Sequence, residues 1–141
     1  MSIDCRTESV GNFRQILQID AHTLHTDISV ASGGDGSAPD PHDYFDASLA
    51  GCKALTAALY AKSHKIALDR VHVQIERDSS AERQGTYVLK VKIGFEGALT
   101  DAERQKLHDI VTRCPVHKLM TTTTIDIQTA PLDPLPDAVT P

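Results

Sequence analysis

Residues 40–52, DPHDYFDASLAGC, guide our interpretation of the rest of the chain. The stretch predicts the start of a long helix, because Asp40 can cap it, Pro41 fits its first turn and Asp43 stands where a capping box needs an acid. A second helix face is also made of small residues, so other elements can approach the helix closely. We therefore expect a central helix that shields Cys52 from bulk water. Its apolar or small positions recur in alternating steps of four and three at Phe45, Leu49, Cys52, Thr56, Leu59, Ser63 and Ile66.

Length, charge and cysteine content limit the classes of function. The 141 residues are most simply one domain, and with only 4% aromatic residues its core must be mainly aliphatic. A net charge of −5 argues against a broad nucleic-acid-binding surface. There is no apolar run of membrane-spanning length and no signal-peptide pattern. Because Cys5, Cys52 and Cys114 are too few for a secreted disulfide framework, we expect a cytoplasmic protein without nucleic-acid or membrane partners.

The remaining sequence predicts an α+β fold with antiparallel sheets around the long helix. Alternating apolar and polar residues indicate strands, and Thr100 with Glu103 can form a capping box that begins a second helix. Residues 130–141 contain four prolines, so we expect one domain over 1–129 followed by a loosely ordered tail. The other expected elements are a hairpin over 12–30, a loop over 31–39, strands near 71–76 and 87–95, a short helix after Cys114 and a last strand at Ile125 and Ile127.

Cys52 and Cys114 lie far apart in the sequence, so only the fold could bring them together. Cys114 is expected at the N-terminal end of the short helix, where backbone N–H groups favour a thiolate. Cys52 lies within its helix, so its thiolate would need a cationic or hydrogen-bonding neighbour. Lys53 is adjacent, but neighbouring helix positions do not face each other. The alternative is that each cysteine is simply a small buried hydrophobic residue.

Two motifs resemble the cysteine motifs of the OsmC/Ohr family. Residues 40–56 resemble the sequence around the family's first cysteine, and RCPVHKL at 113–119 resembles its second cysteine motif. The elements between them also match, so the resemblance covers about residues 12–128 and is closer to the YhfA-like branch than to Ohr itself. It implies an OsmC-like α+β fold in which two chains interlock as a homodimer. It also implies thiol-dependent reduction of organic hydroperoxides, an antioxidant activity used in oxidative stress.

The resemblance further implies that Cys52 is the peroxidatic cysteine and Cys114 the resolving one. The Cys52 thiolate would attack the peroxide, its sulfenic acid would condense with Cys114, and an external dithiol would reduce the disulfide. Exclusion of water would favour bulky apolar peroxides over hydrogen peroxide. The glutamate that follows the proline in the best-studied peroxidase branch is His42 here. Asp43, one position later, and Arg14, from the N-terminal strand region, are therefore the residues expected to assist Cys52.

No cofactor or metal is expected. The glycine-rich loop lacks the lysine and hydroxyl of a phosphate-binding motif, and the histidines lack a zinc-like spacing beside a cysteine pair. Cys52, Cys114 and His117 could nevertheless form a three-ligand site. The residues expected to line a pocket near the thiol are His42, Phe45, Leu49, Thr56 and His117.

Two alternatives to the peroxidase stay open. The first is a non-catalytic protein whose pocket holds a hydrophobic or thiol-reactive small molecule, and selective oxidation of Cys52 by peroxide would separate it from the peroxidase. The second is a thiol–disulfide exchange protein acting on other proteins, which would require an exposed cysteine pair.

Overall fold

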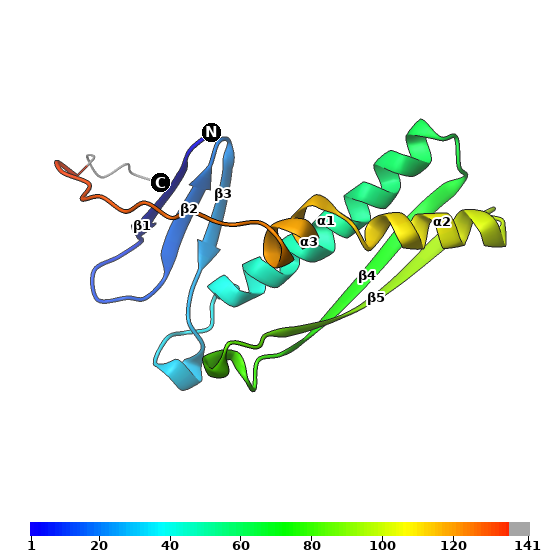
Figure 1. Ribbon diagram of the computed structural model, residues 1–141. Helices are drawn as coiled ribbons and strands as arrows, with labels where there is room; N and C mark the ends of the chain where they lie inside the picture. Colours follow the sequence, from blue (N-terminus) through cyan, green and yellow to red (C-terminus); the bar gives the residue numbers. More distant parts are fainter. Residues whose placement is uncertain (136–141) are drawn as a thin grey trace.

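The computed structural model describes residues 1–135, which form an α+β fold (Figure 1). A three-stranded antiparallel sheet precedes the long helix, and a two-stranded antiparallel sheet follows it. The long helix packs on the second sheet and on the two helices that follow. In chain order the elements are β1 (Ile3–Thr7), β2 (Gln15–Ile19), β3 (His22–Thr26), α1 (Pro41–Ser63), β4 (Leu68–Asp78), β5 (Val88–Gly97), α2 (Asp101–Val111) and α3 (Pro115–Thr121), with 3-10 turns at Val30–Ser32 and Glu82–Gln84.

Helix α1 begins as the sequence predicts. The Asp43 backbone N–H donates to the Asp40 carboxylate at 2.9 Å, and the Asp40 N–H donates to the Asp43 carboxylate at 2.9 Å, which completes the capping box. Pro41 occupies the first turn, where its missing N–H costs nothing. The helix ends at Ser63, shortly before Lys65 adopts a left-handed φ of 52° that interrupts helical geometry.

The buried face of α1 differs from the face that the apolar periodicity predicts. Of the predicted positions only Leu49 is buried, whereas Leu59 is 68% exposed and Cys52 is half-buried. The single chain therefore covers one face of the central helix and leaves Leu55 and Leu59 exposed. The physical reason is that polar side chains on the buried face find partners on other elements. That face consists of Asp46, Leu49, Lys53, Ala57 and Ala61.

The hydrophobic core lies between α1, the β4–β5 sheet and α2. Ala57 and Ala61 of α1 pack against Leu107 and Val111 of α2, and these two α2 side chains are completely buried. Burying such a side chain contributes about 1.5–3 kcal/mol. The capping box of Thr100 and Glu103 begins α2 as the sequence predicts, and Leu107 and Val111 form the buried face of this helix.

Beyond α3, the predicted last strand is absent. Ile125 and Ile127 are 63% and 82% exposed, and within residues 1–135 no strand pairs with this segment, so it stays extended without secondary structure. Conversely, β1 was not indicated by the sequence but pairs with β2. Residues 130–135 of the predicted tail are exposed, and 136–141 lie outside the described residues. Within the described part of the chain, none of the helices has the length and apolar content to cross a membrane.

Candidate functional site

The fold brings the two cysteine segments together. The backbone N–H of Val116 donates a hydrogen bond to Sγ of Cys52, with an N to S distance of 3.5 Å. Val116 follows Pro115 in the first turn of α3, and Cys114 is the N-cap residue of that helix. Cys114 is completely buried and Cys52 is half-buried. An N–H donor stabilises a negatively charged sulfur more than a neutral one, so Cys52 has the hydrogen-bonding neighbour that the sequence could not identify.

Lys53 joins the helices on either side of Cys114. Its Nζ donates to the carbonyl of Val111, the last residue of α2, at 2.7 Å and lies 3.4 Å from Nδ1 of His117 in α3. The side chain is only 3% exposed. As the sequence predicts, Lys53 faces a different side of α1 from Cys52, but through these contacts it supports the turn that carries Val116. Because Val111 and His117 lie far from Lys53 in the sequence, no local pattern could have indicated that Lys53 connects α2 and α3.

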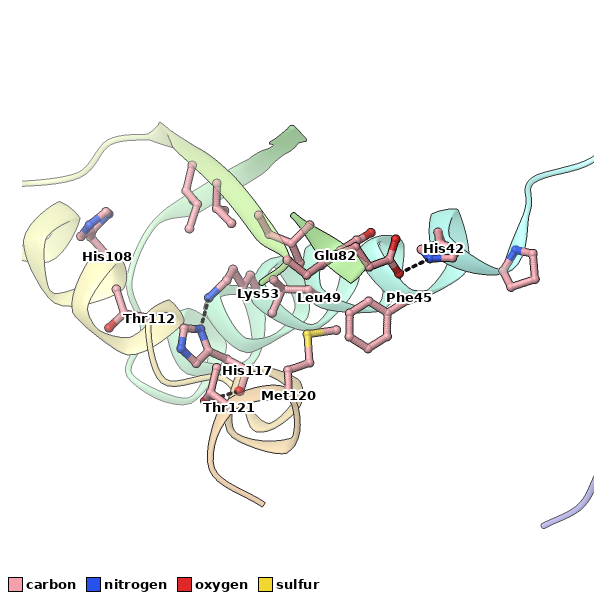
Figure 2. A pocket seen from close by; sticks show the side chains of 15 residues that line it. His42, Phe45, Leu49, Lys53, Glu82, His108, Thr112, His117, Met120 and Thr121 are labelled. Carbon is pink, nitrogen blue, oxygen red and sulfur yellow. Dashed lines mark hydrogen bonds and ion pairs between the residues drawn. The ribbon is translucent and has the colours of Figure 1, made fainter. Parts of the chain in front are cut away.

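A cavity of about 830 Å³ lies between α1, β5, α2 and α3 (Figure 2). Four of the five predicted pocket residues line it, namely His42, Phe45, Leu49 and His117, whereas Thr56 does not. Neither Cys52 nor Cys114 lines this cavity in the single chain. Its wall is mostly apolar, with Leu89, Val91 and Ile93 from β5 and Met120 from α3.

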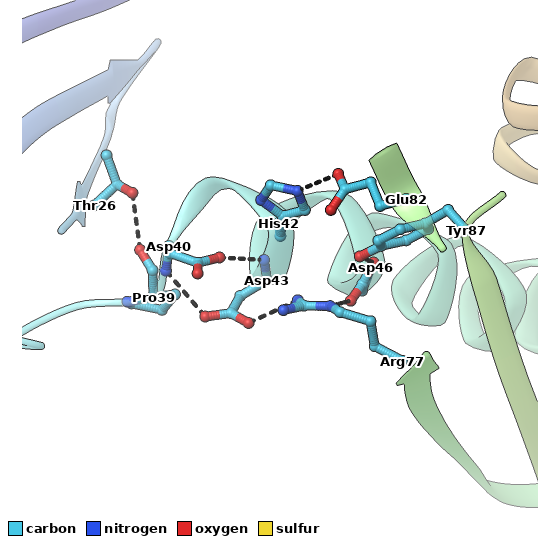
Figure 3. Close-up of polar contacts among 9 residues, drawn as sticks. All are labelled: Thr26, Pro39, Asp40, His42, Asp43, Asp46, Arg77, Glu82 and Tyr87. Atoms are coloured by element: carbon cyan, nitrogen blue, oxygen red, sulfur yellow. Dashed lines mark hydrogen bonds and ion pairs between the residues drawn. The ribbon is translucent and has the colours of Figure 1, made fainter. Parts of the chain in front are cut away.

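An ionic network anchors the start of α1 to the second sheet (Figure 3). Arg77 of β4 donates from Nη2 to Asp43 at 2.8 Å and from Nε to Asp46 at 2.6 Å. The hydroxyl of Tyr87 donates to the other oxygen of Asp46 at 2.7 Å. Burial, followed by the hydrogen bond and the charge of Asp46, raises the pKa of Tyr87 to about 12. The network was not predicted, because it joins helix α1 to strand β4 and to the residue just before β5, which are far apart in sequence.

Asp43 and Arg14, the residues expected to assist Cys52, are engaged elsewhere in the single chain. The pKa of Asp43 is lowered, first by the Asp40 backbone N–H and then by the Arg77 guanidinium. Arg14 lies just before β2, where it forms an ion pair with Glu8 at 3.0 Å and donates to Ser37. The structure does not bring either side chain to Cys52, and their expected functions stay predictions.

The His42 side chain pairs with the carboxylate of Glu82. Its Nε2 lies 2.7 Å from a carboxylate oxygen of Glu82, and this hydrogen bond raises the pKa of His42. Among residues 1–135, no three His, Cys, Asp or Glu side chains are grouped as ligands for a metal ion. The set of Cys52, Cys114 and His117 is accordingly not assembled as a metal site, and the ring of His117 faces Lys53 instead.

Comparisons with known proteins agree with this architecture. Residues 34–130 match the family described as OsmC-like protein. Three solved structures resemble the chain: a Psychrobacter arcticus protein assigned to osmotic-stress induction and the detoxification response (TM-score 0.72, 20% identity, 86% of this chain and 89% of that one), an OsmC-like protein from Mycoplasma pneumoniae (0.68, 17%, 86% and 86%), and an organic hydroperoxide resistance protein OsmC from Legionella pneumophila (0.60, 18%, 86% and 90%). At these identities the likeness shows the fold. No curated protein sequence matches the chain.

Proposed function

The chain belongs to the OsmC-like protein family, and we propose that it reduces organic hydroperoxides with Cys52 as the peroxidatic cysteine and Cys114 as the resolving cysteine. The observation that carries the proposal is the hydrogen bond from the Val116 N–H to Cys52 Sγ, because it puts a thiolate-stabilising donor on Cys52 two residues after Cys114. The organic hydroperoxide resistance protein of Legionella pneumophila shares the fold, which agrees with this choice of substrate class.

The proposed cycle has three steps. The Cys52 thiolate attacks the distal peroxide oxygen, the O–O bond breaks, and the alkoxide takes up a proton and leaves as an alcohol. Cys52 is then a sulfenic acid, which condenses with the Cys114 thiol to give a disulfide and one water. An external dithiol reduces this disulfide by thiol–disulfide exchange and becomes a disulfide itself. Overall, one hydroperoxide is reduced for each dithiol oxidised. The proposed setting is the cytoplasm, where such dithiols are maintained in the reduced state.

We further propose that the active form is a homodimer. Leu55 and Leu59 expose 65% and 68% of their area on α1, and Ile125 and Ile127 are exposed beyond α3. A single chain would leave these apolar groups in water, whereas a second copy would cover them and exclude water from Cys52. Arg14 or Asp43 of the second copy could then approach Cys52, although neither reaches it within one chain.

The test uses fully reduced protein and one equivalent of cumene hydroperoxide, followed by thiol counting and disulfide mapping. The unmodified chain should lose two thiols and form a Cys52–Cys114 bridge. The Cys114→Ser variant should stop at a sulfenic acid that a dimedone probe captures, and Cys52→Ser should not react. Cys5→Ser is the matched control and should behave as the unmodified chain, because Cys5 is exposed on β1. Survival of both thiols in excess peroxide would refute the proposal.

A non-catalytic binding function is the second candidate, because neither cysteine lines the cavity between α1, β5, α2 and α3. In that case Cys52 would resist peroxide, while a small molecule would still bind in the cavity. Exchange of disulfides with other proteins is less favoured, since the complete burial of Cys114 keeps its sulfur away from a protein partner.

A further inference from the structure

We propose that the cavity between α1, β5, α2 and α3 binds a small amphipathic organic anion, with its carboxylate on Lys53 and its apolar tail along β5. This inference rests on the charges and shape of the cavity and not on the proposed peroxidase cycle, because neither cysteine lines the cavity.

Within the described residues, no carboxylate balances the charge of Lys53. Its side chain is 3% exposed, yet among residues 1–135 no carboxylate lies within ion-pair distance of its Nζ. A buried cation is strongly destabilising unless an anion and hydrogen bonds compensate it. An ammonium has three donors, and Lys53 has only the Val111 carbonyl at 2.7 Å and His117 Nδ1 at 3.4 Å as partners. At least one N–H of Lys53 is therefore available to a ligand.

His117 offers a second donor to a ligand in the cavity. If Nδ1 accepts from Lys53, the ring proton is on Nε2, which has no hydrogen-bond partner among the described residues. His117 lines the cavity beside Lys53, so a carboxylate there could accept from both side chains. Two donors on one carboxylate resemble the bidentate arrangement that makes recognition of this group strong.

The two ends of the cavity differ in polarity. In Figure 2, Lys53 and His117 lie toward the end of the cavity marked by His108 and Thr112. Phe45 and Met120 lie between them and the far end, which is marked by His42. The one acid in the lining, Glu82, lies at that far end and is already bound by His42 at 2.7 Å. A ligand with one anionic head and an apolar tail therefore matches the cavity, whereas a cation would meet Lys53.

The chemical class follows from size and charge together. A volume of about 830 Å³ is within the range of small-molecule sites. The apolar stretch of β5 runs along the cavity through Leu89, Val91 and Ile93, which suits an unbranched or aromatic tail of several carbons. The site is thus expected to prefer a medium-chain monocarboxylate over the corresponding alcohol or amine.

The experiment is calorimetric titration of the full-length protein with octanoate, 1-octanol and octylamine, which share one tail. Octanoate should bind once per chain and at least about tenfold more tightly than octanol, since a hydrogen bond to a charged group contributes that much or more, and octylammonium should bind more weakly than octanol. In Lys53→Met, which keeps the length of the side chain, octanoate should lose this advantage while octanol binds as before. Lys62→Met removes an exposed lysine from the same helix and should leave all three affinities unchanged.

Equal binding of octanoate and octanol, or no binding of either, would overturn the proposal, and so would an octanoate preference that survives in Lys53→Met. If Lys53→Met fails to fold, the three-ligand comparison on the unmodified chain still decides. The outcome is independent of the peroxidase test, because octanoate carries no peroxide and thiol counting does not report on Lys53.

Discussion

Replacing Arg77 with methionine tests whether the ionic network holds α1 against the second sheet. Methionine preserves most of the length of the side chain but removes both hydrogen bonds, to Asp43 at 2.8 Å and to Asp46 at 2.6 Å. Asp46 would keep only the Tyr87 hydroxyl as a partner. The variant thus leaves a nearly buried carboxylate without its cation.

The expected loss can be worked out from the exposure of the partners. The Asp43 side chain is 50% exposed, so its pair with Arg77 contributes at most about 1 kcal/mol. The Asp46 side chain is 12% exposed, and a hydrogen bond to a charged group in such a place contributes about 1.5–3 kcal/mol. Because Arg77 itself is 27% exposed, we take the lower half of that range. The free energy of unfolding should therefore fall by about 1.5–3 kcal/mol.

Urea unfolding at one fixed protein concentration measures this loss, because the stability of an oligomer depends on concentration. The matched control is Arg70→Met in the same strand, whose pair with Glu96 joins side chains that are 80% and 68% exposed. That variant should lose less than about 0.5 kcal/mol. If Arg77→Met is no more destabilised than Arg70→Met, the network does not anchor α1 and the reasoning fails.

The pKa of Tyr87 is raised to about 12, so the stability that this tyrosine contributes is complete below about pH 10 and should be lost as the pH rises through 12. An ultraviolet absorbance titration should show a step near pH 12 that Tyr87→Phe lacks. Asp40→Ala removes the capping box and should lower the free energy of urea unfolding by about 1 kcal/mol, whereas Asp40→Asn should lower it by less. Leu59→Asp should convert the proposed dimer to monomers in sedimentation equilibrium, since Leu59 is 68% exposed in one chain and a charge there would oppose its burial by a second copy. An unchanged mass would show that this face of α1 is not in the interface.

Local chemistry explains what the sequence could predict. Both capping boxes involve residues three positions apart, so Asp40 with Asp43 and Thr100 with Glu103 are visible in the sequence and determine where α1 and α2 begin. Strand alternation likewise predicts the β4–β5 pair, and Pro115 predicts the start of α3 directly after Cys114. The order of these segments, together with the two cysteine motifs, made it possible to predict the fold from the sequence.

Long-range partners explain what it could not predict. Asp46 and Lys53 are charged, so periodicity assigns them to solvent, but their partners Arg77 and the Val111 carbonyl come 31 and 58 positions later. These contacts turn a face of small alanines inward and leave Leu59 outside. The same choice of buried face places Lys53 beside the cavity. Neither the cavity nor its cationic end can be predicted from a short stretch of sequence.

The remaining discrepancies concern apolar groups that one chain leaves uncovered. Ile125 and Ile127 alternate with polar residues as a half-buried strand does, yet in the single chain they are exposed and unpaired. A strand requires a neighbouring edge, and within the described residues β1, β3, β4 and β5 are all edge strands. If a second copy offers such an edge, residues 125–127 gain hydrogen bonds and the exposed face of α1 gains cover at the same time. Hydrogen exchange at the Ile125 and Ile127 amides should therefore slow only when the protein is dimeric. If these amides are also protected in the Leu59→Asp monomer, the pairing of residues 125–127 does not depend on the dimer that covers α1.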